Sequence, residues 1–287
     1  MAAKAVVFAY HDVGARCLGA LLDAGVEVPL VVTHRDDPAE KIWFASVSAF
    51  SKQNKIRTLE DPANPDLQKE LREIHPDFIF SFYYRRMLPV SLLKLAKRGA
   101  FNMHGSLLPK YRGRAPVNWA VLRGETETGA TLHQMVEKPD AGRIVDQERV
   151  PIGPDEAAVE VFRKVTAAAE KIMKRSIEKI ISGTVVLKPQ DLSRGSYFGG
   201  RRPEDGRIDW SKSAAEIHNL VRAVAPPYPG AFTEFEGRKL KIFRSKKEER
   251  IPPENRKGPY REGKEWFAVC GDGKVLRLLD VELAEEK

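Results

Sequence analysis

A chain of 287 residues is too long for one minimal domain, and its hydrophobic content of 42% is ordinary for a globular protein. The net charge of +8 suggests nucleic acid, anionic membranes or phosphorylated small molecules as partners, but the basic excess is spread along the chain, which argues against a dedicated nucleic-acid surface. Cys17 and Cys270 form no zinc or redox motif, so we expect two free thiols in a reducing compartment.

The beginning of the sequence carries no targeting pattern. Its apolar run, residues 5–10, is too short for the core of a signal peptide. No run approaches the roughly 20 apolar residues of a membrane span. We therefore expect a cytoplasmic protein without membrane insertion.

The first part of the chain alternates strand and helix patterns. We expect strands at 4–10, 26–33, 77–83 and 100–104, and helices at 18–24, 40–52 and 67–74. This alternation predicts an α/β fold with a mostly parallel sheet and helices on both faces. The turn after the first strand, residues 10–14, lacks the G-x-G-x-x-G pattern, so we expect neither NAD nor flavin.

The remainder of the chain changes character twice. Further elements are expected as a helix at 116–122, strands at 128–136 and 144–151, and a long helix at 155–181. Glycines and prolines over 183–212 indicate a linker. After it, a helix at 214–224 and short strands at 231–235, 239–244, 266–270 and 275–279 predict a small β-barrel-like domain, with 246–250 as an exposed loop. We expect domains at 1–190 and 200–287.

The most informative segment is F-N-M-H-G-S-L-L-P, residues 101–109. In an extended strand, Asn102 and His104 point to the same side, at the carboxyl end where open α/β sheets bind ligands. An amide can stabilise an oxyanion, and an imidazole can take a proton from an attacking amine. These residues therefore suit acyl transfer, although the spacing alone also fits two polar side chains packed at a strand end.

Asp140 is the third candidate, in the loop sequence K-P-D-A-G. A carboxylate beside an imidazole stabilises the imidazolium and raises its pKa, although an aspartate before Ala-Gly is also a common turn former. His133 is expected to be structural within a strand, and His11 could touch a ligand. The remaining histidines form no ligand cluster, so we expect no metal.

The sequence resembles the folate-dependent formyltransferases over essentially its whole length. The resemblance rests on 101–116, on G-E-T-E-T-G at 124–129 and on P-D-A-G at 139–142. It implies a Rossmann-like N-terminal domain and a small barrel-like, OB-like C-terminal domain. It also implies that Asn102, His104 and Asp140 are the catalytic trio, with Asn102 stabilising the oxyanion, His104 acting as general base and acid, and Asp140 tuning His104.

Two segments, 6–12 with 33–41 and 46–47, and 81–85, resemble the sugar-nucleotide branch of that family, as do 198–206 and 219–229 in the linker and beyond. They are most similar to the formyltransferase part of the bifunctional polymyxin-resistance enzymes, which formylate UDP-4-amino-4-deoxy-L-arabinose for lipid A modification. Methionyl-tRNA formyltransferases carry a glycine- and arginine-rich loop where this chain has Asp36, Asp37 and Glu40, a poor surface for a phosphate backbone.

The resemblance implies 10-formyltetrahydrofolate as co-substrate and a UDP-linked 4-amino sugar as acceptor, with no metal. Folate contacts are expected at Arg86, Met87, Leu88, Arg114, Val136, Glu137, Lys138 and Pro139. Acceptor contacts are expected at His11, Arg201, Asn219, Arg222 and Tyr228. The alternatives are methionyl-tRNA, another nucleotide-linked amino sugar, or a binding module without catalysis. We expect small-molecule partners, no nucleic acid, and possible oligomerisation.

Overall fold

The computed structural model describes residues 2–36, 42–60 and 66–284. The chain forms two compact units, and each is assembled from separate stretches of sequence. The first comprises Met1–Gly113, Gly129–Val150 and Lys164–Tyr197. The second comprises Arg114–Thr128, Pro151–Arg163 and Phe198–Lys287.

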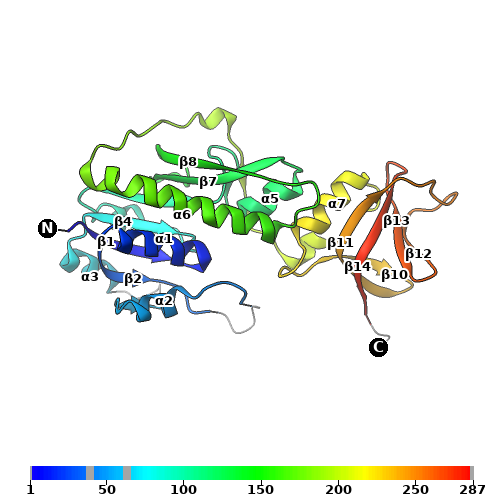
Figure 1. The fold of residues 1–287 in the computed structure, drawn as a ribbon, viewed down its shortest axis with the longest axis horizontal. Coiled ribbons are helices and arrows are strands. Elements are labelled where there is room, and N and C mark those ends of the chain that lie inside the picture. Colours follow the sequence, from blue (N-terminus) through cyan, green and yellow to red (C-terminus); the bar gives the residue numbers. More distant parts are fainter. Residues whose placement is uncertain (1, 37–41, 61–65, 285–287) are drawn as a thin grey trace. The chain divides into compact units, whose positions relative to one another are not determined.

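A seven-stranded sheet in the order β3-β2-β1-β4-β5-β7-β8 organises the first unit (Figure 1). Its strands are β1 Lys4–Ala9, β2 Glu27–Val32, β3 Thr58–Leu59, β4 Phe78–Phe82, β5 Gly99–His104, β7 Glu127–Gln134 and β8 Ile144–Pro151. The strands from β3 to β5 pair in parallel, whereas β7 runs antiparallel to β5. The mostly parallel sheet expected from the alternation of elements is confirmed.

Helices cover both faces of this sheet. The helices that contribute are α1 His11–Asp23, α2 Val47–Gln53, α3 Leu67–Ile74, α4 Val90–Leu93 and, from Lys164 onward, α6 Ala158–Ser182. One face packs Val6, Phe8 and Ile79 against leucines of α3 and α4. An ion pair of 3.1 Å joins Arg16 to Glu170, so α1 and α6 lie side by side (Figure 1).

Helix α1 begins at His11 rather than at residue 18, because a close contact not evident from the apolar pattern stabilises its first turns. A Cβ atom at Gly14 would lie 3.1 Å from the Ala9 Cβ, so the missing side chain lets α1 approach the end of β1. Helix α2 begins at Val47, where the Ser46 hydroxyl accepts the Ala49 N–H. The helix expected at 40–52 is therefore shorter than predicted: residues 42–46 are not helical, and the expected start at residue 40 lies outside the described residues.

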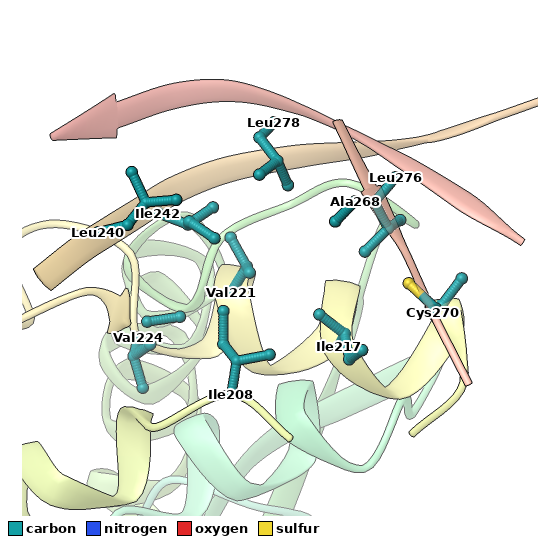
Figure 2. Close-up of a cluster of buried hydrophobic side chains, with 12 residues drawn as sticks. Ile208, Ile217, Val221, Val224, Leu240, Ile242, Ala268, Cys270, Leu276 and Leu278 are labelled. Atoms are coloured by element: carbon teal, nitrogen blue, oxygen red, sulfur yellow. The ribbon is translucent and has the colours of Figure 1, made fainter. Parts of the chain in front are cut away.

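The second unit contains α5 Pro116–Leu122 and α7 Ala214–Ala223 with an antiparallel sheet in the order β10-β11-β14-β13-β12. Its strands are β10 Ala231–Phe235, β11 Arg238–Glu248, β12 Gly258–Glu262, β13 Glu265–Val269 and β14 Val275–Leu283. The apolar face of α7 fills the concave side of the sheet: Figure 2 shows Ile217 and Val221 opposite Leu240, Ile242 and Leu278. The expected small β domain is a curled half-barrel.

Several short elements were not evident from the sequence. Strand β11 continues to Glu248, so the expected loop at 246–250 is wrong for its first residues; those residues pair with β14. The expected linker contains two 3₁₀ turns, Leu192–Arg194 and Pro203–Gly206, and strand β9 Tyr197–Phe198, which pairs with β6 Arg112–Gly113. No helix in the described part of the chain is long and apolar enough to cross a membrane.

Candidate functional site

The register between β5 and β7 builds the centre of the candidate site. Asn102 lies opposite His133, and His104 lies opposite Thr131. Directly opposed residues of antiparallel strands project to the same face, and so do alternate residues of one strand. Four polar side chains therefore share one face of the sheet at the carboxyl end of β5.

His104 is held by hydrogen bonding at one nitrogen and by charge at the other. Its Nε2 donates to the carbonyl oxygen of Tyr111 at 2.7 Å, which leaves the lone pair of the neutral ring on Nδ1. That Nδ1 lies 3.7 Å from Oδ1 of Asp140. Only 6% of His104 is exposed, so protein groups rather than bulk water determine its protonation.

Asp140 reaches this cluster from the loop between β7 and β8. Its Oδ2 accepts the Gly113 N–H at 2.9 Å, and its Oδ1 faces both His104 and His133, the latter at 3.5 Å from Nε2. The backbone of Asp140 has φ of 51°, a left-handed conformation that aspartate tolerates better than most residues. The carboxylate therefore bridges the two imidazoles and strand β6.

Two neighbours hold the loop that carries Asp140. The Gln190 side-chain amide donates to the carbonyl oxygens of Asp140 and Gly142, at 3.0 and 2.5 Å. A Cβ at Gly142 would lie 1.9 Å from the Gln134 carbonyl oxygen, so only glycine permits this close approach. The P-D-A-G sequence is thus a turn former as well as the bearer of the carboxylate.

His133 contacts two members of the expected trio, although the sequence indicated only a structural residue. Its Nε2 lies 3.1 Å from Nδ2 of Asn102, and its Nδ1 lies 2.8 Å from the Gln134 carbonyl oxygen. The residue is 1% exposed. The one sequence signal was the strand period, which places His133 on the same face as the residue two positions earlier, Thr131.

Burial controls the electrostatics of the cluster. Desolvation lowers the pKa of His104 and outweighs the raising effects of the Asp140 carboxylate and the Tyr111 carbonyl. The expectation that Asp140 raises the pKa is therefore right in sign for that pair, but the net shift is downward. Burial opposes ionisation of Asp140, yet the two imidazoles and the Gly113 amide hold the pKa of this carboxyl below its usual range. At neutral pH the neutral ring of His104 therefore lies beside the ionised carboxylate of Asp140.

The S-L-L-P loop is tied to the same sheet face through Thr131. The Thr131 hydroxyl donates to the Ser106 carbonyl oxygen at 2.6 Å and accepts the Leu108 N–H at 3.2 Å. Gln147 donates from Nε2 to the same hydroxyl and to the Leu108 carbonyl oxygen, both at 2.9 Å. The peptide bond between Leu108 and Pro109 is cis. The buried Thr131 hydroxyl thus connects β7 to the S-L-L-P loop that follows β5.

Most of the expected folate contacts lie at the surface of the first unit. Met87 and Val136 are apolar side chains that are 67% and 44% exposed. Arg86, Glu137 and Lys138 are exposed as well. Leu88 and Pro139 are half-buried. Arg114 belongs to the second unit, where its N–H donates to the Phe198 carbonyl oxygen at 2.9 Å. The exposed apolar side chains suit contact with a flat, partly apolar ligand.

His11 lies among aromatic side chains just after β1. Its ring stacks on Phe44 with 3.8 Å between centroids, and Trp43 meets it edge-on. Burial and the Arg85 charge lower the pKa of His11 to about 3, so it is a neutral acceptor at physiological pH. Its Nδ1 accepts the Asp12 N–H.

The other expected acceptor contacts all lie in the second unit. The Arg201 guanidinium covers the Trp119 ring at 5.2 Å, and its Nη2 donates to the Asp205 carbonyl oxygen. The buried Arg222 donates to Asn219 Oδ1 and to main-chain carbonyl oxygens, those of Val121, Gly153 and Glu156. Burial raises the pKa of Tyr228 to about 12. These contacts hold the side chains of Arg222 and Asn219 within the second unit, and their contact with an acceptor stays a prediction.

A pocket of about 900 Å³ lies within the second unit. The buried His218 and Arg222 line it, together with exposed charges of both signs, among them Asp155 and Arg244. His218 bonds to Ser245 Oγ and to the Pro154 carbonyl oxygen, each at 3.0 Å. No residue of the expected trio lines this pocket. Among the described residues, no group of three or more His, Cys, Asp or Glu side chains is arranged to hold a metal ion.

Comparison with known proteins finds two family models that together span most of the chain. The model described as Formyl transferase matches residues 4–177, and that described as Formyl transferase, C-terminal domain, matches residues 201–287.

Solved structures share the fold at low sequence identity. The N-formyltransferase from Helicobacter canadensis, crystallised with folinic acid and dTDP-3-aminofucose, is 23% identical, with a TM-score of 0.74 over 97% of this chain and 99% of that chain. A 4-N formyltransferase from Francisella tularensis is 22% identical, with a TM-score of 0.68 over 83% of this chain and 95% of that chain. HypX from Aquifex aeolicus with tetrahydrofolic acid is 20% identical, with a TM-score of 0.66 over 95% of this chain and 43% of that one.

Proposed function

Because the chain belongs to the formyl transferase family, we propose that it transfers the formyl group of 10-formyltetrahydrofolate to the primary amine of a nucleotide-linked amino sugar. The observation that carries this proposal is the convergence of Asn102, His104 and Asp140. Asn102 and His104 come from one strand and Asp140 from a distant loop, and each supplies a group that acyl transfer to an amine requires.

We assign His104 the role of general base. Its neutral ring donates from Nε2 to the Tyr111 carbonyl oxygen, so a proton accepted from the attacking amine arrives at Nδ1. The resulting imidazolium has a partner at both nitrogens, because Nδ1 faces the Asp140 carboxylate. The pairing stabilises the charged ring that forms during the reaction, and the same ring can return the proton to the leaving nitrogen.

We assign Asn102 the role of oxyanion donor. A transferring formyl group develops negative charge on its oxygen, and a preorganised amide N–H stabilises that charge. Folate itself supplies the activated formyl carbon when it is bound. The exposed apolar side chains of Met87 and Val136 suit its ring system, and Arg86 suits a carboxylate.

A sugar nucleotide is the acceptor that the chain supports best. Asp36 follows the second strand and accepts a hydrogen bond from the Tyr10 hydroxyl at 2.9 Å, so this surface carries an acidic group where a phosphate backbone would need basic ones. Asp37 and Glu40 of the same segment lie outside the described residues. The Helicobacter formyltransferase was crystallised with a nucleotide-linked amino sugar, dTDP-3-aminofucose.

Within this class we propose UDP-4-amino-4-deoxy-L-arabinose, the precursor for lipid A modification in polymyxin resistance. The support is the sequence resemblance at 6–12, 33–41, 46–47 and 81–85. Small molecules are then the partners, and we propose the cytoplasm as the place of reaction. We also propose that residues 1–190 form the catalytic domain and residues 200–287 the C-terminal domain.

The test is a product assay with the purified protein and 10-formyltetrahydrofolate. A panel of UDP- and dTDP-linked 3-amino and 4-amino sugars is incubated with enzyme, and mass spectrometry detects the gain of one formyl group. We expect the UDP-linked 4-amino arabinose to be the preferred acceptor by kcat/KM. Faster formylation of a dTDP-linked sugar would overturn the finer assignment, and formylation of methionyl-tRNA alone would overturn the sugar class.

A further inference from the structure

A pairing that the general acid–base scheme does not use connects Asn102 to the neighbouring strand. Asn102 and His133 are a directly opposed pair in the antiparallel ladder of β5 and β7. Opposed side chains of such a pair have Cβ atoms about 5 Å apart, so they touch across the strands. Nδ2 of Asn102 lies 3.1 Å from Nε2 of His133.

The other imidazole nitrogen determines the direction of this hydrogen bond. Nδ1 of His133 lies 2.8 Å from the Gln134 carbonyl oxygen, which can only accept, so the ring proton is on Nδ1. In the neutral ring Nε2 is then an acceptor and takes one N–H of Asn102. An amide oxygen in that place would meet a lone pair, so the ring selects which end of the Asn102 amide faces it.

The remaining N–H of the amide is left for a ligand. Within the part of the chain that the structure describes, Asn102 Nδ2 has His133 as its one protein partner. His133 is 1% exposed, so bulk water does not compete with the Asn102 amide for Nε2 of His133. A fixed donor costs little reorganisation when charge develops opposite it, whereas a rotating amide must first be oriented.

We propose that His133 is a positioning residue of the formyl-transfer site, which acts by holding the Asn102 amide with its nitrogen toward the ring and its second N–H available to the formyl oxygen. This inference rests on the proposed function for its catalytic consequence. The contact itself does not depend on the identity of the acceptor.

Asp140 offers a competing partner for the same nitrogen. Its Oδ1 lies 3.5 Å from His133 Nε2, compared with 3.1 Å for the Asn102 amide. Only a ring protonated at both nitrogens could donate to this carboxylate, and it would then release the Asn102 N–H. The shorter contact favours Asn102, whereas the Gln134 carbonyl accepts from Nδ1 in either state of the ring, so a test has to separate the two partners.

The first measurement is spectroscopic and needs no substrate. The side-chain amide of Asn102 is followed by NMR with asparagine labelled with ¹⁵N, and its signal is assigned by its loss in Asn102→Ala. We expect His133→Phe, which removes both ring nitrogens at similar volume, to shift this signal and speed its exchange with water. Leu132→Val serves as control, because this buried neighbour changes core packing without a hydrogen bond.

The second measurement is a double-mutant cycle on turnover. His133→Phe alone should lower kcat by about 10- to 100-fold with KM changed less than about 3-fold, as expected when an interaction is made in the transition state. In the Asn102→Ala background the same substitution should cost less than about 3-fold, because its target is gone. His133→Gln, whose amide oxygen can accept in place of Nε2, should recover most of the loss.

The outcomes separate the inference from the function on which it rests. An unshifted Asn102 amide signal in His133→Phe would overturn the inference whatever the enzyme formylates. Equal losses in both backgrounds would also overturn it, and so would coupling to Asp140→Asn instead of Asn102→Ala. Wild-type protein that formylates no amine would refute the proposed function, while the NMR result still decides whether His133 holds the amide.

Discussion

The amide of Asn102 provides a measure of the oxyanion contribution. We expect Asn102→Ala to lower turnover by about 10²–10³, the usual loss for one oxyanion donor, with little effect on substrate binding. Steady-state kinetics on the preferred acceptor give kcat and KM separately. Asn54→Ala is a suitable control, because Asn54 is exposed and its side chain bonds only to the Phe50 carbonyl oxygen within the described residues. Normal turnover with a raised KM would remove Asn102 from the oxyanion role.

The carboxylate of Asp140 acts on His104 through charge. Asp140→Asn should lower the pKa of His104 further, because burial already lowers it and the carboxylate is the largest opposing influence. The acid limb of the pH–rate profile should therefore move to lower pH, and turnover should fall by about 10²–10⁴ as the imidazolium loses its partner. NMR titration of His104 gives the direction directly. A raised histidine pKa in the variant would contradict this account.

The pKa of His104 depends on two opposing influences, burial of the ring and the charge of Asp140. A more exposed His104 beside Asp140 would be protonated near neutral pH and would be a poor base. Burial keeps the His104 ring neutral before the reaction. The Asp140 carboxylate then stabilises the imidazolium that forms in the transition state. The tuning therefore needs both the core and the loop.

At the scale of elements, Thr131 joins β7 to the S-L-L-P loop. Thr131→Val keeps the volume but removes a hydroxyl with three partners, namely Ser106, Leu108 and Gln147. Buried groups left without partners cost about 1–3 kcal/mol each, so we expect the free energy of unfolding to fall by about 2–4 kcal/mol. Urea unfolding monitored by circular dichroism measures it.

The same strand offers a matched control for this variant. The Thr128 hydroxyl is also buried, but it has no hydrogen-bond partner among the residues that the structure describes. Thr128→Val should therefore leave stability unchanged or raise it slightly. Equal destabilisation by the two substitutions would mean that β-strand packing, and not the loop anchor, sets the cost.

At the scale of the whole molecule, buried imidazoles make the fold sensitive to acid. Burial lowers the pKa of His11 to about 3 and that of His34 to about 4, with Arg85 adding to both shifts, and it lowers those of His104 and His218 as well. Unfolding returns each ring to its ordinary pKa near 6.5, so the unfolded state binds more protons between pH 6.5 and 4. Stability should be complete above pH 6.5 and fall through that window.

The urea midpoint measured at pH 7.5, 6 and 5 tests this expectation. Each buried histidine contributes at most about 1.4 kcal/mol per pH unit, and less where the ring is partly exposed, as for His34. The double variant His11→Gln, His34→Gln should flatten the dependence, whereas His75→Gln at an exposed position should not. A midpoint that is constant from pH 7.5 to 5 would falsify the account.

The sequence by itself determined the α/β class, the bounds of many elements and the pair Asn102 and His104. Helices α3 and α5 and strands β8 and β10 have the expected limits, because local periodicity and turn residues define them. Asn102 and His104 share a sheet face for the same reason, since the strand period of two operates within one short segment. The helix α1 start and the length of β11 were misjudged, because close packing at Gly14 and pairing with β14 are not local properties.

Only the tertiary structure decided which distant residues complete the site. His133 reaches Asn102 through the antiparallel register of β7, and Asp140 reaches both histidines through a loop held by Gln190. Register and loop closure join residues some 30 positions apart, and no local pattern encodes them. The net lowering of the His104 pKa was likewise decided in three dimensions, because desolvation depends on how completely the folded chain surrounds the ring.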